Sequence, residues 1–196
     1  MGAGRLRPPA DNGPLPGVDV TWLSDERGRL AADRILDAAA GLFVEHGVGA
    51  VGMGEIARAA GCSRATLYRY FADRDELHTA FVHREARRVG REVAAAVDDV
   101  PPDQLVTEAV LDAVRRVRET PTLAAWFADG DAARTAALAQ SSEVIEALGL
   151  SVVDDPDDAR WLVRVILSLL TVPGRDEADE RAMVERYVAP RVTSEA

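Results

Sequence analysis

The sequence predicts an all-α fold, with a small N-terminal helical unit followed by a larger C-terminal one, and three observations favour it. Hydrophobic residues make up 47% of the chain but aromatic residues only 5%, so alanine and aliphatic residues provide most of the apolar surface. Alanine, leucine, arginine and glutamate also lose little conformational freedom in a helix. Finally, apolar residues recur every three or four positions, and glycine, proline and N-capping residues separate the resulting stretches.

We expect the ordered structure to follow a flexible tail, residues 1–24. Pro8, Pro9, Pro14 and Pro16 interrupt this segment, and proline removes backbone donors that a helix or strand needs. The first helix is expected to begin after Ser24, a good N-cap residue, and to end at Gly47. Its apolar face consists of Ile35, Leu36, Ala39, Leu42 and Phe43.

Two short helices are predicted next, over 53–60 and 64–71. Gly61 permits a sharp turn between them, and Ser63 can cap the second helix. The inward residues of the pair are Ile56, Ala57, Ala60, Leu67 and Phe71. The pattern therefore indicates a small helical unit with its own core.

A long helix is predicted from Arg74 to about Asp98. Asp73 and Glu76 form a capping box at its start, and a pair of prolines, Pro101 and Pro102, ends it. Its inward residues are Leu77, Phe81, Val89, Val93 and Val97. Such a helix is about 35 Å long, which suits a rigid connection between two regions.

Further helices are predicted over 105–118, in a short segment from Pro121, and over 131–148. The first has a double apolar stripe, formed by Leu105, Ala109, Ala113 and Val117 and by Val106, Val110 and Val114. Arg115, Arg116 and Arg118 lie off that stripe, so a solvated face is expected for them. Asp155 and Pro156 begin another helix, at N-cap and N1, and the last helix is predicted over 176–188.

The last two helices carry more apolar surface than a single chain needs. Between Trp161 and Val172, only Arg164, Ser168 and Thr171 are polar. A four-helix bundle formed with a second copy is therefore expected. Its predicted interface residues are Leu162, Val165, Ile166, Leu169, Met183, Val184 and Tyr187. The alternative is an interior helix of a monomer.

The distribution of charge favours a nucleic-acid partner for the N-terminal half only. The net charge is −10, and all 23 basic residues are arginines. Residues 1–91 carry 13 arginines and 12 acidic residues, whereas residues 92–196 carry 10 and 21. Between Ile56 and Tyr70 there are three arginines and no acidic residue. This segment fits a DNA-reading part attached to an acidic part that DNA does not touch.

The two short helices fit a helix-turn-helix, whose second helix enters the major groove. Its outward residues are predicted to be Arg64, Ala65, Thr66, Tyr68 and Arg69. Arginine can bond guanine bidentately, alanine and threonine methyls can contact thymine, and tyrosine hydroxyls can bond phosphates. Two arginines in the tail, Arg5 and Arg7, leave open a minor-groove arm, although a passive tail is the simpler interpretation.

Residues 33–43 (DRILDAAAGLF), 55–71 (EIARAAGCSRATLYRYF) and 73–77 (DRDEL) closely resemble the N-terminal domain of TetR-family transcriptional regulators, over about residues 30–78. The resemblance implies base reading by Arg64, Ala65 and Arg69, and phosphate contacts by Tyr68, Tyr70 and Arg74. The sequence departs from the family at two glycines. Gly52 replaces a threonine that caps the helix over 53–60, and Gly54 replaces a side chain that can reach a base.

The resemblance implies a homodimeric repressor that binds double-stranded, pseudo-palindromic operator DNA and is released by an unidentified small-molecule effector. A cytoplasmic location is expected because no signal peptide opens the sequence and its longest apolar stretch, 161–172, is too short to span a bilayer. Residues 25–74 would bind DNA, and residues 75–196 would bind the ligand and dimerise. Three aromatic residues, Trp126, Phe127 and Trp161, are candidates for the ligand pocket, or else ordinary core residues. We expect no cofactor, no catalytic grouping, no metal site and no membrane span. One alternative is an activator or DNA-organising protein without an effector, and another is an all-helical enzyme with an accidental helix-turn-helix.

Overall fold

The computed structural model describes residues 20–192 except 129–136, 138–139, 142–143 and 151. Within these ranges all regular secondary structure is helical, which confirms the predicted fold class. The helices are α1 (Val20–His46), α2 (Met53–Ala59), α3 (Arg64–Tyr70), α4 (Arg74–Ala96), α5 (Pro102–Glu119), α6 (Pro121–Ala128), the π-helix η1 (Ile145–Gly149), α9 (Pro156–Thr171), α10 (Glu177–Tyr187) and α11 (Ala189–Val192). No described helix is both long and apolar enough to cross a membrane.

Helix α1 begins at Val20, earlier than the sequence analysis expected, so Ser24 lies inside the helix and is not its N-cap. The flexible tail was predicted to extend to residue 24, but residues 20–24 are helical. The rest of the predicted tail, residues 1–19, lies outside the described residues. The physical reason is that no proline follows Pro16 in this region, and lengthening an existing helix needs no new nucleation step. At its other end α1 stops at Gly47, which adopts a positive φ of 79°.

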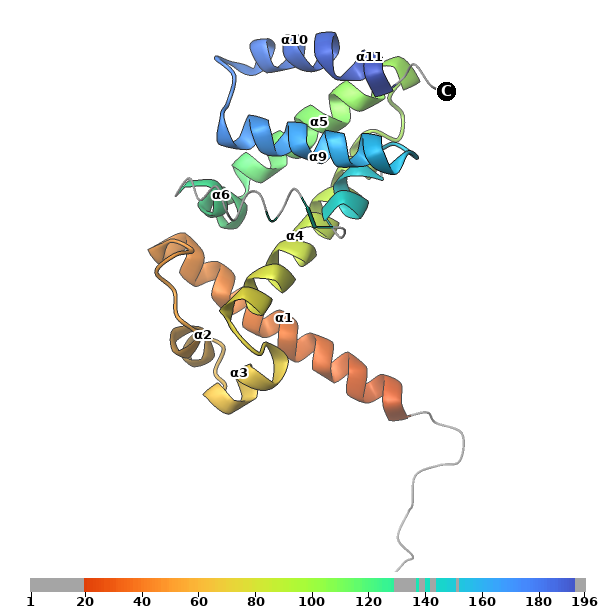
Figure 1. The fold of residues 1–196 in the computed structure, drawn as a ribbon. Coiled ribbons are helices and arrows are strands. Elements are labelled where there is room, and N and C mark those ends of the chain that lie inside the picture. Colours follow the sequence, from red (N-terminus) through yellow and green to blue (C-terminus); the bar gives the residue numbers. More distant parts are fainter. Residues whose placement is uncertain (1–19, 129–136, 138–139, 142–143, 151, 193–196) are drawn as a thin grey trace, which may run out of the picture.

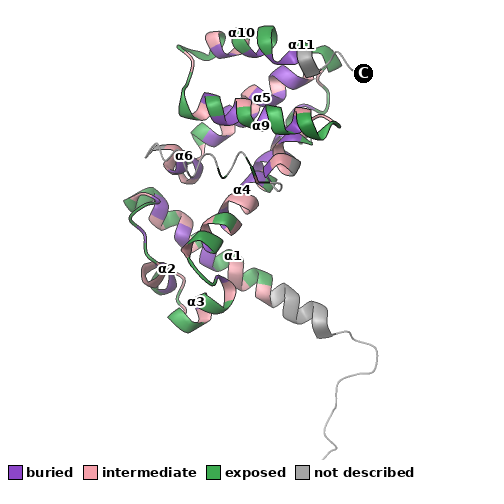
Figure 2. Ribbon diagram, in the orientation of Figure 1, coloured by how far each residue is buried: buried purple, intermediate pink, exposed green. Residues whose placement is uncertain are grey.

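Helix α2 packs against α1, and α3 packs against α2, at one end of the molecule, and α4 leads from them toward the helices at the other end (Figure 1). Figure 2 shows that the buried residues of α1 and α4 face their neighbours. Phe43, Ile56 and Leu67 are fully buried, as the apolar pattern predicted. Gly61 has a φ of 69°, a left-handed conformation that lets the chain reverse between α2 and α3.

Helix α4 connects the two ends of the molecule. Asp73 caps it by accepting a hydrogen bond from the Glu76 amide at 2.8 Å. The Glu76 side chain accepts from the Ala72 amide at 2.5 Å, one residue earlier than in an ordinary capping box. Five predicted inward residues, Leu77, Phe81, Val89, Val93 and Val97, are all buried. The predicted long helix is thus confirmed to within two residues at its C-terminal end.

Two arginines of α5 do not form the solvated face that the sequence analysis expected. Arg116 donates to Asp112 at 2.5 Å and to Glu92 of α4 at 2.9 Å. Arg118 donates to both carboxylate oxygens of Glu180 in α10, at 2.7 and 2.8 Å. Glu92 and Glu180 lie in other helices, 24 and 62 residues away in the sequence, so helical periodicity alone could not reveal them. The hydrogen bonds that Arg116 and Arg118 donate to Asp112 and Glu180, respectively, raise the pKa values of the two arginines.

The helix predicted over 131–148 is not continuous. Much of it lies outside the described residues, but Gln140 is in a turn and Ser141 is not helical. The chain then forms η1, which packs closely on α4 at Gly90. A Cβ atom at Gly90 would lie 2.9 Å from the carbonyl carbon of Ala147 and still closer to its oxygen. Only glycine fits this approach.

Helices α9 and α10 begin as predicted. Asp155 accepts hydrogen bonds from the amides of Asp157 and Asp158, and Asp176 caps α10 through the Asp179 amide. Four of the residues predicted at a dimer interface are buried inside the single chain, namely Leu162, Ile166, Leu169 and Val184. These side chains therefore fill the protomer's own core, because α5 covers this side of the two helices.

Candidate DNA-binding surface and apolar cavity

Helix α3 is held in place from behind and is exposed in front (Figure 2). Leu67 and Phe71 are buried beneath it, at 0% and 4% exposure. The Ser63 hydroxyl accepts a hydrogen bond from the Thr66 amide at 3.0 Å, so the predicted N-cap is confirmed. A seven-residue helix with a fixed start and a buried underside presents its outward side chains in a defined geometry.

The side chains on α3 differ in how freely they face solvent. Arg64, Ala65, Tyr68 and Arg69 are exposed, while Thr66 and Tyr70 are half-buried. The Thr66 hydroxyl also lies 2.9 Å from the Ser63 hydroxyl, so it shares the capping interaction. The Arg69 guanidinium lies over the Tyr70 ring, 5.2 Å from its centroid. The exposed chemistry of α3 is therefore cationic at both ends.

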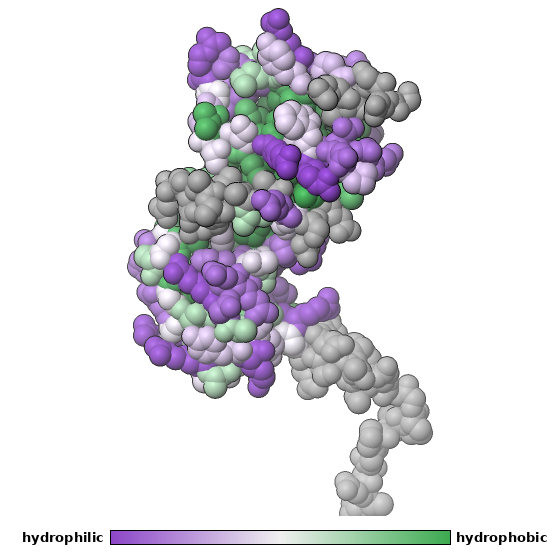
Figure 3. Space-filling view, viewed as in Figure 1, coloured by the Kyte–Doolittle hydropathy of each residue, from purple (hydrophilic) through white to green (hydrophobic). Residues whose placement is uncertain are grey.

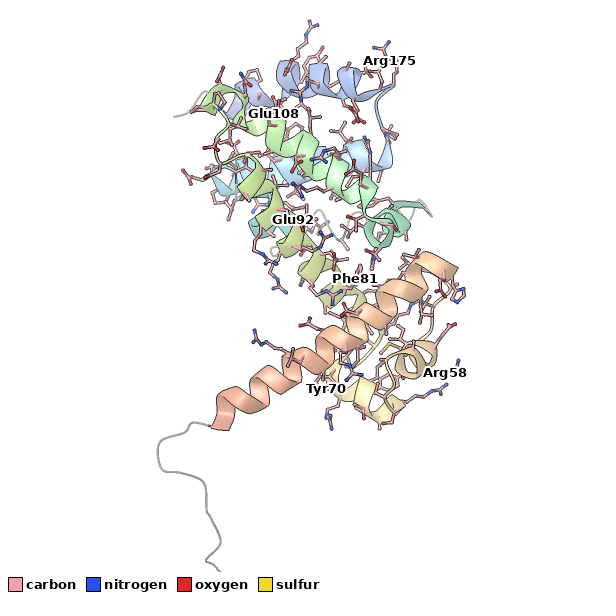
Figure 4. The ribbon with its side chains drawn as sticks, turned by 180° about the vertical axis from the view of Figure 1, so that it is seen from behind. Arg58, Tyr70, Phe81, Glu92, Glu108 and Arg175 are labelled. Carbon is pink, nitrogen blue, oxygen red and sulfur yellow. The ribbon has the colours of Figure 1, made fainter. Side chains whose placement is uncertain are left out.

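The surrounding surface keeps this cationic character. Arg58 on α2 is also exposed and, with Tyr70, lies at the α2–α3 end of the molecule (Figure 4). Within the described part of the chain, Arg58, Arg64 and Arg69 take part in no salt bridge. Their charges are thus available to a polyanion.

The N-terminus of α2 lacks a side-chain cap because position 52 is a glycine. This residue is the N-cap and provides no side-chain hydrogen bond to the helix. The second unusual glycine, Gly54, lies directly beneath the guanidinium of Arg64. The absence of a side chain at this position leaves the space that Arg64 occupies.

Arg74 has an intramolecular role that sequence reasoning missed. Its Nη2 atom donates to the carbonyl oxygens of Val48 and Gly49, at 2.6 and 2.7 Å, and its Nε donates to His78 at 3.4 Å. The guanidinium therefore holds the loop that leads into α2. A phosphate contact by Arg74 stays a prediction, and it would have to be compatible with these bonds.

A small apolar cavity lies between α4, α5, α6, η1 and α9. It is lined by Val82, Glu85, Ala86, Val89, Val117, Leu123, Trp126, Phe127, Val144, Leu148, Val163, Ile166, Leu167 and Leu170, and it encloses about 50 Å³. Among the described residues of this lining, Glu85 is the one that can ionise. Arg84 and Arg88 both donate to its carboxylate, at 3.3 and 2.9 Å. Its charge is therefore balanced by the protein.

The aromatic residues beside the cavity connect it to α1. Trp126 stacks on Phe81 of α4, with centroids 5.6 Å apart, and meets Phe43 of α1 edge to face at 5.9 Å. It also contacts His78 at 5.2 Å. Of the three predicted pocket residues, the structure brings Trp126 and Phe127 together and places Trp161 elsewhere.

Trp161 belongs to a separate groove between α9 and α10. The groove has a volume of about 280 Å³ and is lined by Trp161, Arg164, Val165, Ser168, Leu169, Met183, Val184, Tyr187 and Val188. Trp161, Met183 and Tyr187 are 43%, 44% and 62% exposed. Figure 3 shows hydrophobic residues gathered between these helices on the face in view. The sequence analysis predicts apolar surface on these two helices, but it places Trp161 in the ligand pocket and not on this surface.

Comparison with known proteins agrees with this geometry. Residues 35–81 match the profile described as "Bacterial regulatory proteins, tetR family". The uncharacterized HTH-type transcriptional regulator Rv1255c of Mycobacterium tuberculosis H37Rv is 50% identical over 189 residues, covering 91% of this chain and 93% of its own. Among solved structures, the TetR family repressor AlkX from Dietzia sp. strain DQ12-45-1b has a TM-score of 0.63 at 20% identity, covering 81% of this chain and 96% of its own.

A second solved structure has the same fold. The transcriptional repressor QsdR of R. erythropolis has a TM-score of 0.61 at 19% identity, covering 84% of this chain and 95% of its own. The whole-length similarity to a regulator, the family profile over α1 to α4 and the helix-turn-helix together leave one assignment. This chain belongs to the TetR family of transcriptional regulators and is not an enzyme.

Proposed function

We propose that this regulator is a cytoplasmic repressor that binds a pseudo-palindromic operator as a homodimer and is released by a small-molecule effector. One observation carries the DNA-binding part: α3 presents Arg64, Ala65, Tyr68 and Arg69 outward from a buried support. Residues 25–74 form the DNA-binding domain in this proposal, and residues 75–196 form the sensing and dimerisation domain. Thr66, Tyr70 and Arg74 complete the proposed contact set.

The groove between α9 and α10 is the proposed dimer interface. Exposed apolar patches of this kind mark interaction sites in soluble proteins, and two helices packing on their symmetry mates form a four-helix bundle. Trp161, Val165, Met183 and Tyr187 supply the apolar contacts, with Arg164 and Ser168 at the edge. Leu162, Ile166, Leu169 and Val184 support these helices from within the protomer.

The apolar cavity is the proposed effector site, and its lining favours a small uncharged molecule. Of the fourteen described residues that line it, thirteen are apolar, and the carboxylate of Glu85 already has two arginine partners. A ligand carrying its own charge would lose hydration without gaining a free counter-charge. A volume of about 50 Å³ is far below the roughly 300–1,000 Å³ of ordinary ligand pockets. Binding must therefore move the walls apart.

Such movement has a direct route to the DNA-binding domain. Trp126 touches Phe43 of α1 and Phe81 of α4, and Arg84 beside the cavity donates to Asp37 of α1 at 2.8 Å. An effector that displaces Trp126 therefore changes the support of α1, and with it the separation of the two recognition helices. Release from DNA then requires only that the effector binds the dimer with the changed helix separation more tightly than it binds the DNA-binding dimer.

Selection from random duplex DNA tests the proposal. The chain is expected to enrich an inverted repeat whose half-sites lie about 34–36 Å apart or at a related spacing. The selected complex is then titrated with matched neutral and anionic compounds, octanol against octanoate and toluene against benzoate. Release by the neutral members supports the effector class, and release by the carboxylates alone contradicts it. Enrichment of no sequence contradicts DNA binding, while a complex that no compound releases favours a regulator without an effector.

Replacing Met183 with glutamate is expected to convert the dimer to a monomer. Met183 is 44% exposed in the single chain, so the change spares the fold, but the symmetric interface would have to remove two added carboxylates from water in place of two apolar side chains. Light scattering of the eluted protein measures the mass, and operator affinity should fall by at least tenfold. Ala182→Glu is the matched control, because Ala182 is exposed on the same helix outside the groove. Equal behaviour of the two variants would place the interface elsewhere.

A further inference from the structure

We infer that Gly54 determines operator specificity, because its missing side chain sets the position from which Arg64 reads DNA. This inference rests on the proposed function. A Cβ atom built on Gly54 would lie 2.8 Å from Nε and 2.9 Å from Cζ of Arg64, and closest to Nη2. The guanidinium therefore lies in contact with the backbone of α2, in the space that any other residue would fill.

Two ordinary reasons for a glycine do not apply at this position. The first is a left-handed backbone, but among the described glycines only Gly47 and Gly61 have a positive φ. The second is a capping position, but Gly52 is the N-cap and Ala60 the C-cap of α2, so Gly54 caps neither end of the helix. The remaining reason for a glycine at position 54 is that a side chain there would overlap the guanidinium of Arg64.

The rest of the helix-turn-helix is rigid enough to make this contact decisive. Ile56 and Leu67 are fully buried between α2 and α3, and the Cys62 amide donates to the Ala57 carbonyl at 2.9 Å across the turn. The capped start of α3 fixes the backbone of Arg64. The side chain of Arg64 is then the part that can move, and a neighbour at position 54 decides where its guanidinium lies.

This position matters because arginine recognises guanine through a planar pair of donors, which needs a defined orientation. Against Gly54, the guanidinium lies next to α2, with Nη2 and Nε nearest to the position that a Cβ atom would take. A side chain at position 54 forces it away from α2, and its donors then meet a different base edge. Since only the flexible end of Arg64 has to shift, the fold survives the change.

The test compares Gly54→Ala with the unsubstituted protein, using Gly52→Ala as a matched control. Gly52 is two residues away and exposed, and a Cβ atom there would have nothing within 4 Å. Selection from random duplexes gives the base preference at each operator position. Gly54→Ala is expected to change the preference at one position in each half-site by at least fivefold, and Gly52→Ala at none. The thermal midpoint of Gly54→Ala should not fall below that of the unsubstituted protein.

The double variant Gly54→Ala with Arg64→Ala shows whether the effect acts through Arg64. In the absence of Arg64, the alanine at position 54 is expected to change nothing. An equal change with and without Arg64, or an unchanged preference in Gly54→Ala, overturns the inference while leaving the proposed function standing. If the unsubstituted protein enriches no sequence, the proposed function fails and this inference fails with it.

A measurement without DNA provides an independent check. The side-chain Nε–H resonance of Arg64 is assigned by its absence in Arg64→Ala. It is expected to shift in Gly54→Ala and to stay in place in Gly52→Ala. A resonance unmoved by Gly54→Ala contradicts the contact itself.

Discussion

Replacing Arg118 with alanine is expected to lower the free energy of unfolding by about 3 kcal/mol, toward the lower end of the range for breaking a buried ion pair. The Glu180 side chain is only 4% exposed, and Arg118 donates to both of its oxygens. Without Arg118, this carboxylate keeps a single bond, from the Gly174 amide at 2.9 Å. The Leu169 carbonyl also loses its Arg118 donor. Arg118 itself is 36% exposed, so water offsets part of the loss.

Urea denaturation followed by helical circular dichroism, at one fixed protein concentration, measures this difference. Arg175→Ala is the control. Arg175 pairs with Asp179, which lies in α10 like Glu180, but the Arg175 side chain is 86% exposed. That change should alter stability by no more than about 0.5 kcal/mol. Adding Glu180→Ala to Arg118→Ala is expected to restore part of the loss, because no uncompensated charge then remains. Equal effects of Arg118→Ala and Arg175→Ala would contradict this account.

The same pair makes stability depend on pH in a definite direction. The hydrogen bond from Arg118 holds the pKa of Glu180 below its ordinary value. A carboxyl whose pKa is lower in the folded state stabilises the fold fully above its unfolded pKa, near 4.3, and loses that contribution as pH falls toward the folded pKa. The difference between the unsubstituted protein and Arg118→Ala should therefore be largest near pH 7 and shrink below about pH 4.

Features that depend on neighbouring residues could be predicted from the sequence. Ser63, Asp73 and Asp155 each accept a backbone amide two or three residues later, and this bond is local by nature. Buried positions on α4 and α5 followed from helical periodicity for the same reason. The helix-turn-helix formed by α2 and α3 could be predicted because its turn requires a positive φ at a single residue, Gly61.

Features that depend on contacts between distant segments could not be predicted in this way. Arg118 and Glu180 are 62 residues apart, and no periodicity connects them. Trp161 and Trp126 are both apolar and helical, so only the packing separates the groove from the cavity. The position of Arg64 over Gly54 likewise depends on how α2 crosses α3. A resemblance to a family locates the recognition helix but leaves these three-dimensional relationships open.

Replacing Arg64 with alanine is expected to weaken binding to the selected operator by about 1–3 kcal/mol per half-site, and by about twice that for a dimer contacting both half-sites. Arg64 is exposed at the start of α3 and has no ion-pair partner within the described residues. Its donors are therefore free to bond a base edge, and their loss removes discrimination between sequences. Fluorescence anisotropy with the operator and with a scrambled duplex should give a specificity ratio that collapses toward one, while unfolding midpoints stay unchanged.

Arg74→Ala should behave differently, which makes the comparison informative. Its guanidinium bonds the carbonyls of Val48 and Gly49 in the loop before α2, so its loss loosens the domain and weakens binding to all sequences alike. Arg74→Lys then separates two roles, since lysine keeps the charge for a phosphate but cannot reproduce a planar guanidinium's fixed donor geometry. Near-normal affinity in Arg74→Lys indicates a phosphate contact, whereas a loss equal to that of Arg74→Ala indicates that Arg74 acts by holding the loop. If Arg64→Ala and Arg74→Ala reduce specific and nonspecific binding in the same proportion, then α3 does not read bases through Arg64.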